Sequence, residues 1–227
     1  MCGILGYYKK GGFSREDLEK AHQALNRMRH RGPDGEGMHL INTSTGQTWS
    51  LRVADTPEDL RTDLTLDTYL HQQADLVLAH RRLSIFDLSS AGHQPMRDHK
   101  GNVLSLNGEV YNFLELRDEL KPHGHTFKTG SDTEVILAAF RQWGPDAIRR
   151  FNGMWSFMLW DPFAKKLLVS VDRIGIKQLY WAADGDGFVL ASEVKAIRAL
   201  RPQLTVNPVS ARFYLETGAL DYSRESL

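Results

Sequence analysis

The chain has only one cysteine, Cys2, among its 227 residues. A single cysteine cannot form a disulfide within the chain, which fits a reducing compartment. No apolar run approaches the roughly 20 residues that cross a bilayer. Lys and Arg together number 28, as do Asp and Glu, so no positive field exists to hold nucleic acid or an anionic membrane. We therefore predict a cytoplasmic protein that binds neither nucleic acid nor membrane.

An export signal is not expected at the start of the chain. The apolar stretch 1–8 comes before Lys9 and Lys10, whereas a secretory signal carries its positive charges ahead of its apolar part. Apolar residues make up 41% of the chain and charged residues 25%. That composition is typical of a globular protein with one large or two small domains.

Strands are predicted to outnumber helices. Ser14 with Asp17 is a start signal for one helix, and Ser131 with Glu134 is a capping-box pattern that begins another. Helices are expected at 14–30, 113–121, 132–143 and 193–200, and strands at 2–8, 75–79, 102–107, 153–161, 166–172, 178–182 and 187–192. Because the strands run consecutively in the second half, the pattern favours an α+β fold with antiparallel sheets and helices outside.

Two stretches are less regular. Residues 30–37 carry charges, a proline and three glycines, and are predicted to form a loop. Residues 39–74 are predicted to contain a hairpin that turns near Gly46 and a helix at 57–73.

The position of Cys2 suggests a nucleophile. A lone cysteine is usually a small buried hydrophobe, and that reading stays open here. Removal of Met1 would, however, leave a free α-amine on the residue that carries the thiol. An α-amine has a reference pKa of about 8, so it can accept the thiol proton and no catalytic histidine is needed.

Asn107 and Gly108 could stabilise the oxyanion that a thiol forms on a carboxamide. The asparagine amide and the glycine backbone N–H are suitable donors, and glycine allows a close approach. The alternative is an Asn-Gly hairpin turn, which from spacing alone is favoured.

An amino-acid substrate needs a cation for its carboxylate and an anion for its amine. Arg82 suits bidentate carboxylate binding, and Asp132 suits the ammonium. The alternatives are a surface charge at Arg82 and a helix N-terminal acid at Asp132.

Together these features resemble the glutaminase domain of the asparagine synthetases, which are class II glutamine amidotransferases of the N-terminal-nucleophile hydrolase group. The matching blocks occur in the family's order: MCGILG at 1–6, RHRGPDGEG at 29–37, LAHRRLSIFDLS at 78–89, GHQPM at 92–96, LNGEVYNFLELRDEL at 106–120, TGSDTEVIL at 129–137, FNGMWSFMLWD at 151–161, DRIGIKQLY at 172–180 and ASEVKAI at 191–197.

The resemblance implies a fold and a set of roles. The fold would be a four-layer αββα sandwich of two antiparallel sheets. Cys2 would be nucleophile and base, with Asn107 and Gly108 as the oxyanion hole. The glutamine site would consist of Arg82, Leu83, Ile85, Asn107, Gly108, Glu109 and Asp132. No metal site is implied.

The resemblance also implies a division of labour. Residues 1–200 would form the glutaminase domain, and 201–227 a connector and the start of a synthetase domain. ATP and magnesium would belong to that domain, because this chain has no ATP-pyrophosphatase loop and no P-loop. The partners would be L-glutamine and a synthetase domain or subunit that accepts ammonia. The stretch between Gly37 and Leu78 is longer than the family's and has no assigned role.

We therefore expect hydrolysis of L-glutamine to L-glutamate and ammonia through a γ-glutamyl thioester on Cys2. One alternative is a non-catalytic glutamine-binding or regulatory module with the same fold. The other is an amidase that acts on a different amide, although Arg82 and Asp132 favour a free amino acid.

Overall fold

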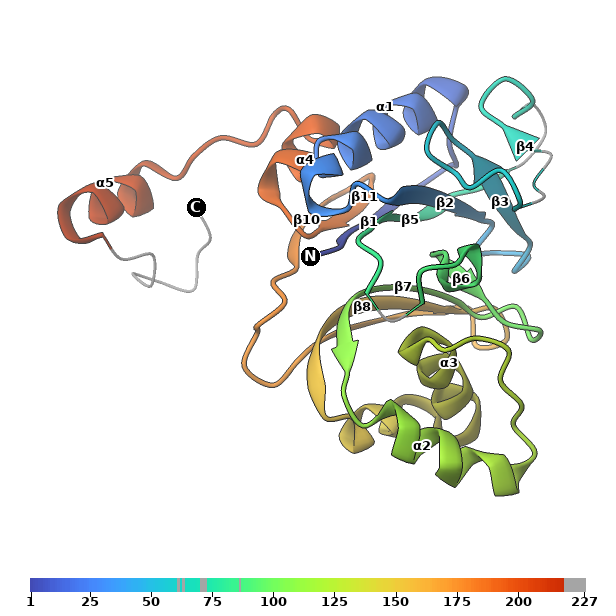
Figure 1. Ribbon diagram of the computed structural model, residues 1–227. Coiled ribbons are helices and arrows are strands. Elements are labelled where there is room, and N and C mark those ends of the chain that lie inside the picture. Colours follow the sequence, from blue (N-terminus) through green and yellow to red (C-terminus); the bar gives the residue numbers. More distant parts are fainter. Residues whose placement is uncertain (61, 63, 70–72, 86, 219–227) are drawn as a thin grey trace.

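Two β-sheets lie face to face in the computed structural model, with helices on their outer faces (Figure 1). The structure describes residues 1–60, 62, 64–69, 73–85 and 87–218. This arrangement is the predicted four-layer αββα sandwich. One detail differs from two purely antiparallel sheets: β3 and β4 pair in parallel at one edge.

The larger sheet has seven strands in the order β10-β11-β1-β5-β2-β3-β4. Its central strands are almost wholly buried because both of their faces are covered. Helices α1 (Arg15–Asn26) and α4 (Val194–Leu200) cover its outer face. The strands are β1 (Gly3–Lys9), β2 (Gly35–Ile41), β3 (Thr48–Arg52), β4 (Leu64–Thr65), β5 (Leu76–Arg82), β10 (Tyr180–Asp184) and β11 (Gly187–Ala191).

The smaller sheet is antiparallel, with the order β6-β7-β8-β9. Helices α2 (Phe113–Leu120) and α3 (Asp132–Trp143) cover its outer face. Its strands are β6 (Met96–Arg97), β7 (Val103–Val110), β8 (Gly153–Asp161) and β9 (Lys166–Val171). Four short 3₁₀ turns connect the elements: η1 (Arg29–Arg31), η2 (Ser90–Gly92), η3 (Lys121–His123) and η4 (Gly144–Arg150).

Side chains alternate between the two faces of each strand, and those on the inner faces form the hydrophobic layer between the sheets. Along β1, Leu5 packs into the cluster beneath α1 and α4, whereas Ile4 packs with Leu78, Met158 and Trp160 from both sheets. Burying each such side chain stabilises the fold by roughly 1.5–3 kcal/mol. The sheets approach closely at Gly6, where a Cβ would come within 2.4 Å of the Met158 sulfur.

The helix predicted at 57–73 is wrong for the residues that the structure describes there, which form turns and the short strand β4. Thr65 and Thr68 bond each other's backbone and hydroxyl groups, which competes with helix formation. Residues 61, 63 and 70–72 of that prediction lie outside the described residues. The predicted hairpin is confirmed, with β2 paired to β3 across a turn in which Gly46 has φ +78°.

Two local predictions need correction. The loop at 30–37 ends earlier than predicted, because β2 begins at Gly35 and pairs with the end of β5. The capping box of α1 is present at Ser14 and Asp17. In α3, Ser131 caps Thr133 N, but Glu134 instead accepts hydrogen bonds from the backbone of Lys128 and Thr129.

Helix α5 (Pro208–Thr217) begins at a cap in which Asn207 accepts from Val209 N and Ser210 N. It projects away from the sandwich in Figure 1. The assignment of 1–200 and 201–227 to separate domains stays a prediction.

A buried ion pair fixes the segment between α1 and β2. Arg81 and Glu36 have fully buried side chains and are 2.6 Å apart. Arg81 also donates to Gly32 O, and a second guanidinium nitrogen lies 2.9 Å from Asp55. Burial alone would raise the pKa of Glu36, but hydrogen bonds from His22, the Asp55 backbone and Arg81 lower it to about 2.

Glu36→Gln is expected to lower the free energy of unfolding by about 3–5 kcal/mol, because it leaves the Arg81 charge buried without its partner. The depressed pKa means that the Glu36 contribution is present above about pH 4.5 and is lost as pH falls toward 2. Urea unfolding at pH 7, 4.5 and 3 measures both effects. The control is Glu16→Gln on the exposed face of α1. Equal losses in the two variants would contradict this role for Glu36.

Candidate functional site

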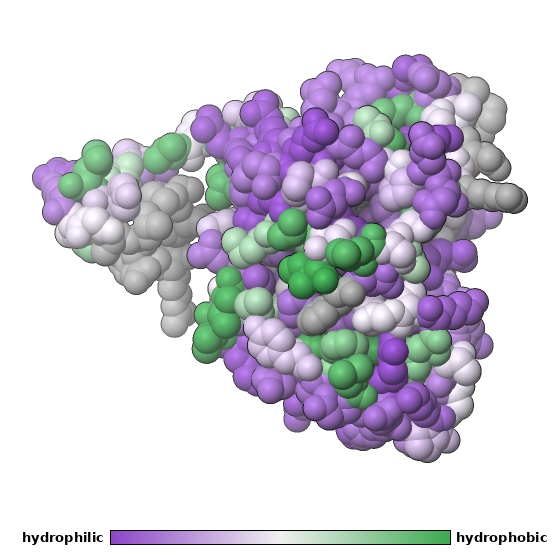
Figure 2. Space-filling view, viewed as in Figure 1, coloured by the Kyte–Doolittle hydropathy of each residue, from purple (hydrophilic) through white to green (hydrophobic). Residues whose placement is uncertain are grey.

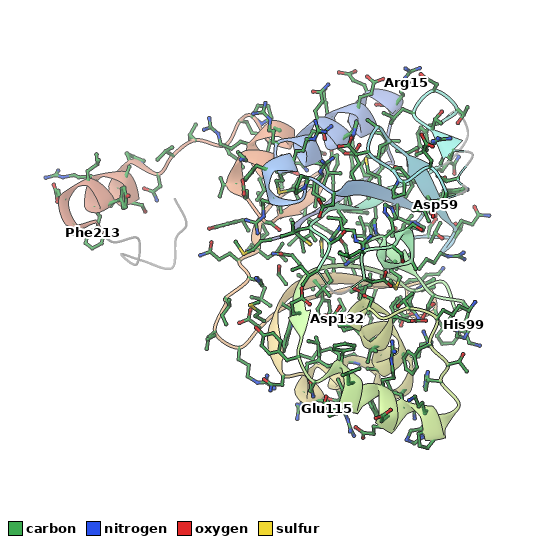
Figure 3. The ribbon with its side chains drawn as sticks, viewed as in Figure 1. Arg15, Asp59, His99, Glu115, Asp132 and Phe213 are labelled. Carbon is green, nitrogen blue, oxygen red and sulfur yellow. The ribbon has the colours of Figure 1, made fainter. Side chains whose placement is uncertain are left out.

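A narrow pocket forms where β1 begins, β5 ends, β7 passes and α3 starts. It brings together seven of the eight residues predicted for the site: Cys2, Arg82, Leu83, Ile85, Gly108, Glu109 and Asp132. These positions are spread over 130 residues of sequence and meet because β1 pairs with β5 and β7 lies below them. Figure 3 shows Asp132 at the start of α3, near the boundary between the two layers.

Cys2 lies at one end of this pocket. Its sulfur is 3.4 Å from Leu83 N and 3.6 Å from Leu83 O. Its carbonyl accepts a hydrogen bond of 2.8 Å from Arg31 Nε. Burial raises the pKa of the Cys2 thiol, against the lowering effect of the Leu83 backbone hydrogen bond. At neutral pH the thiol form therefore dominates, and a nucleophilic role requires a base.

Arg82 is buried and bound by its own loop. One terminal nitrogen donates to Ser89 O at 2.6 Å, and the other donates to Asp87 O. The surface-charge alternative for Arg82 is therefore wrong. A ligand carboxylate at Arg82 would have to share or replace these carbonyl partners.

Asn107 and Gly108 lie inside strand β7, so the hairpin-turn alternative is wrong. Gly108 has φ +149°, and a Cβ there would come within 2.1 Å of Met154 O on β8. Packing against β8 therefore requires glycine at position 108, whether or not Gly108 binds a ligand.

Asn107 is the predicted residue that does not line the pocket. Its side chain is buried, with Nδ2 at 3.5 Å from Ser156 Oγ. Oδ1 has no hydrogen-bond partner in the described part of the chain. An amide whose bonding capacity is only partly used is available to a ligand that reaches it.

Glu109 and Asp132 form an acidic pair in the pocket wall. Asp132 is the first residue of α3 and accepts a hydrogen bond from Val110 N at 2.9 Å, so the helix-terminal reading of this residue is confirmed. Burial raises the pKa of Asp132, against hydrogen bonds from Val110 and Thr133. Burial, together with the nearby charge of Asp132, raises the pKa of Glu109 to about 7, against the opposing charge of Lys177.

Sequence reasoning did not assign several residues that shape this site. Gln94 joins its walls, because its oxygen accepts from Leu106 N at 2.7 Å and its nitrogen donates to Thr133 Oγ1 at 3.3 Å. Asp172 accepts hydrogen bonds from the backbone of Ile174, Ile176 and Lys177 and so shapes the segment that carries Lys177. Gln94 and Asp172 fall within motif blocks, but their buried bonds depend on contacts distant in sequence.

Among the described residues, no group of three or more His, Cys, Asp or Glu side chains could hold a metal ion. None of the helices in the described part of the chain is long and apolar enough to cross a membrane.

Residues 65–224 match the family model described as a glutamine amidotransferase domain. A putative glutamine-hydrolysing asparagine synthetase of Methanocaldococcus jannaschii is 30% identical, over 96% of this chain and 39% of its own length. Asparagine synthetase B of Escherichia coli is 32% identical, over 97% of this chain and 34% of its own length. The chain thus spans less than two fifths of these relatives.

Among solved structures, a glutamine phosphoribosylpyrophosphate amidotransferase of Bacillus subtilis superposes with a TM-score of 0.65 at 19% identity, over 88% of this chain and 44% of that chain. At this identity the likeness shows the fold alone, which is that of the N-terminal-nucleophile hydrolases. The family match covers more than half of the sequence, and the motif blocks begin at Cys2. The chain therefore belongs to the class II glutamine amidotransferase domains.

Proposed function

We propose that this chain hydrolyses L-glutamine to L-glutamate and ammonia through a γ-glutamyl thioester on Cys2. The observation that carries the proposal is the placement of the only thiol in the chain at one end of a pocket whose walls hold Arg82, Glu109 and Asp132. A cation and two carboxylic groups match the two charged ends of a free amino acid. Its side-chain carboxamide would then face the sulfur.

The base in this mechanism is the α-amine of Cys2, freed when Met1 is removed. The sulfur contacts the backbone of Leu83, and none of the histidines that the structure describes is among its hydrogen-bond partners. Since burial raises the thiol pKa, a base on the same residue is the most direct way to deprotonate the thiol. Met1 is 58% exposed, so a peptidase can reach it.

The reaction balances without a cofactor. The sulfur attacks the carboxamide carbon while its proton passes to the α-amine. The tetrahedral intermediate then collapses, the C–N bond breaks, and the amine returns the proton to the departing ammonia. Water attacks the thioester next, giving glutamate and the free thiol. Asn107 Nδ2 and the Gly108 backbone N–H would stabilise the oxyanion in both steps.

Glutamine can enter only after the pocket has opened. The cavity at Cys2 has a volume of about 40 Å³, close to the space of a single water. Arg82 is meanwhile bound to carbonyls of the segment that follows β5. Exchange of those carbonyls for the substrate carboxylate would make room beside Leu83 and Ile85.

The ammonia acceptor is proposed to be a synthetase domain or subunit of the asparagine synthetase type, which would bind ATP and magnesium itself. Figure 2 shows hydrophobic side chains gathered near the N-terminus, at the level where the sheets meet. Ile85, which lines the pocket, is more than half exposed. An apolar surface at the mouth of the pocket would let a covering partner receive ammonia without its loss to water.

Removal of Met1 is expected to be required for turnover. Cys2→Ala should abolish ammonia release, and Cys2→Ser should impair it severely because a hydroxyl is harder to deprotonate. Intact mass and a coupled ammonia assay are measured on the same samples, with a thiol-reactive glutamine analogue to titrate sites. Full activity in protein that keeps Met1 would falsify the self-base mechanism. Labelling by the analogue without any turnover would favour the non-catalytic module.

Arg82→Ala is expected chiefly to raise KM for glutamine, since losing one partner of a charged, hydrogen-bonded pair costs roughly 2–5 kcal/mol. Asn107→Ala is expected chiefly to lower kcat, by about 100-fold or more. Steady-state kinetics separate the two effects. Arg149→Ala, at an exposed arginine remote from the pocket, serves as the matched control. An Asn107→Ala variant altered only in KM would contradict the oxyanion role.

KM for glutamine is expected to rise as pH falls from 8 to 6. Glu109, with a pKa of about 7, is an anion above that pH and loses its attraction for the substrate ammonium below it. Glu109→Gln should have a higher KM at pH 8 and a flatter profile. The exposed Glu115→Gln on α2 is the control. Retention of the full slope in Glu109→Gln would assign the titration to another group.

A further inference from the structure

A second pocket, with a volume of about 260 Å³, lies at the edge of the sandwich beside β3 and β6. Its walls come from the β2–β3 hairpin, from Thr56, Leu60 and Thr62, and from residues between 90 and 97. The first two belong to the stretch between Gly37 and Leu78, to which the family resemblance assigns no role. The pocket is thus built largely from a part of the chain that the proposed reaction does not use.

His39 supplies a polar atom that the protein leaves unpaired. The residue is 3% exposed, and its Nδ1 lies 3.1 Å from Ser50 Oγ on the neighbouring strand. Its Nε2 is buried and has no hydrogen-bond partner in the part of the chain that the structure describes. Leaving a buried nitrogen without a hydrogen bond is unfavourable, so a partner from outside the protein would be favoured.

His93 lines the same pocket and has an unpaired nitrogen as well. Its Nδ1 lacks a partner among the described residues. Its ring is held against β2 at Gly37, where a Cβ would come within 2.5 Å of Nε2. Burial lowers the pKa of His39 to about 3 and that of His93 to about 4. Both rings are therefore neutral at physiological pH, and each has one N–H to donate.

One lining residue of the pocket is a cation, and an acidic residue, Asp59, lies beside the pocket without lining it. Arg97 is an exposed lining residue whose guanidinium makes no hydrogen bond or ion pair within the described residues. Asp59 accepts a hydrogen bond from Ser90, which also lines the pocket. Figure 3 shows Asp59 on the β3 side of the sandwich. Leu51, Leu60 and Met96 contribute apolar walls.

We propose that this second pocket binds a small zwitterionic α-amino acid at a site separate from the candidate glutamine pocket. Its carboxylate would pair with Arg97 and accept a hydrogen bond from the His39 N–H. Its ammonium would face Asp59, and its side chain would contact the apolar walls. A volume of 260 Å³ suits a molecule of that size but not a nucleotide.

The two pockets share the segment 89–93. Ser89 O accepts the hydrogen bond from Arg82, and a Cβ at Gly92 would come within 2.3 Å of an Arg82 nitrogen. Ser90, Ala91 and His93, on the same segment, line the second pocket. An amino acid bound in the second pocket would contact the segment that binds Arg82. Occupancy of the second pocket would therefore be coupled to the hydrogen bonds of Arg82 in the first.

The test is calorimetric titration of Cys2→Ala full-length protein with L-leucine, L-asparagine and L-aspartate, each with and without saturating L-glutamine. At least one is expected to bind with 1:1 stoichiometry in the presence of glutamine, and its N-acetyl derivative is expected not to bind. Absence of binding by all three would overturn the proposal. So would complete displacement by glutamine, because the probe would then occupy the pocket at Arg82.

Substitutions at residues that line the second pocket test whether the probe binds there. Arg97→Gln and His39→Leu should each weaken binding of the probe at least tenfold, whereas Lys100→Gln and His99→Leu, which do not line the pocket, should leave it within twofold. Arg97 is exposed, so its variant keeps the fold and decides the outcome if His39→Leu fails to fold. Unchanged binding in Arg97→Gln would overturn the assignment. These readouts do not require glutamine turnover, so failure here leaves the proposed hydrolysis standing.

Discussion

The antiparallel pairing of β1 with β5 is the constraint on which the candidate site depends. The register places Gly3 opposite Arg81, so the residue before Gly3 and the residues after Arg81 emerge at the same end of the sheet. Cys2 therefore meets Leu83 backbone atoms, and Arg82 enters the same pocket. Since side chains alternate along a strand, a slip of one residue would turn Cys2 to the opposite face. Burial of Ile4 between the sheets and of Leu5 beneath α1 prevents that slip.

A buried charge network supports this end of the sheet from one side. Arg81 immediately precedes Arg82, yet it points the other way, toward Glu36, Gly32 and Asp55. Side chains alternate along a strand, so Arg81 points into the layer under α1 and Arg82 points into the pocket. The two adjacent arginines therefore have different roles. Arg81 holds the backbone of the segment whose Arg31 donates to the Cys2 carbonyl. Substitution at Arg81 would act on the site through position rather than through contact.

Much of the fold could be predicted from local sequence pattern, since helices such as 132–143 and strands such as 153–161 have strong periodicity and clear caps. Prediction failed where distant contacts decide the structure. Gly35 and Gly37 read as loop residues, but β5 recruits them into β2, where Gly37 leaves room for His93. Asn107-Gly108 has the local signature of a turn, and only the partner strand β8 makes it continuous strand. The motif blocks named the pocket residues, yet neither the binding of Arg82 by its own loop nor the roles of Gln94 and Lys177 can be read from spacing.

The electrostatics of the pocket suit a substrate that brings its own charges. Burial raises the pKa of both Glu109 and Asp132, and the charge of Asp132 further raises that of Glu109, so the empty pocket disfavours two full negative charges. Arg82, a cation in the pocket wall, is stabilised by hydrogen bonds to loop carbonyls instead of by these carboxylates. An entering ammonium would stabilise the ionised form of both acids, and an entering carboxylate would replace the carbonyls at Arg82. Each end of a zwitterion therefore removes an electrostatic cost that the empty site carries, whereas a neutral amide would remove neither. In the proposed reaction, the same wall would discriminate a free amino acid from the carboxamides of a peptide before any bond at Cys2 is formed.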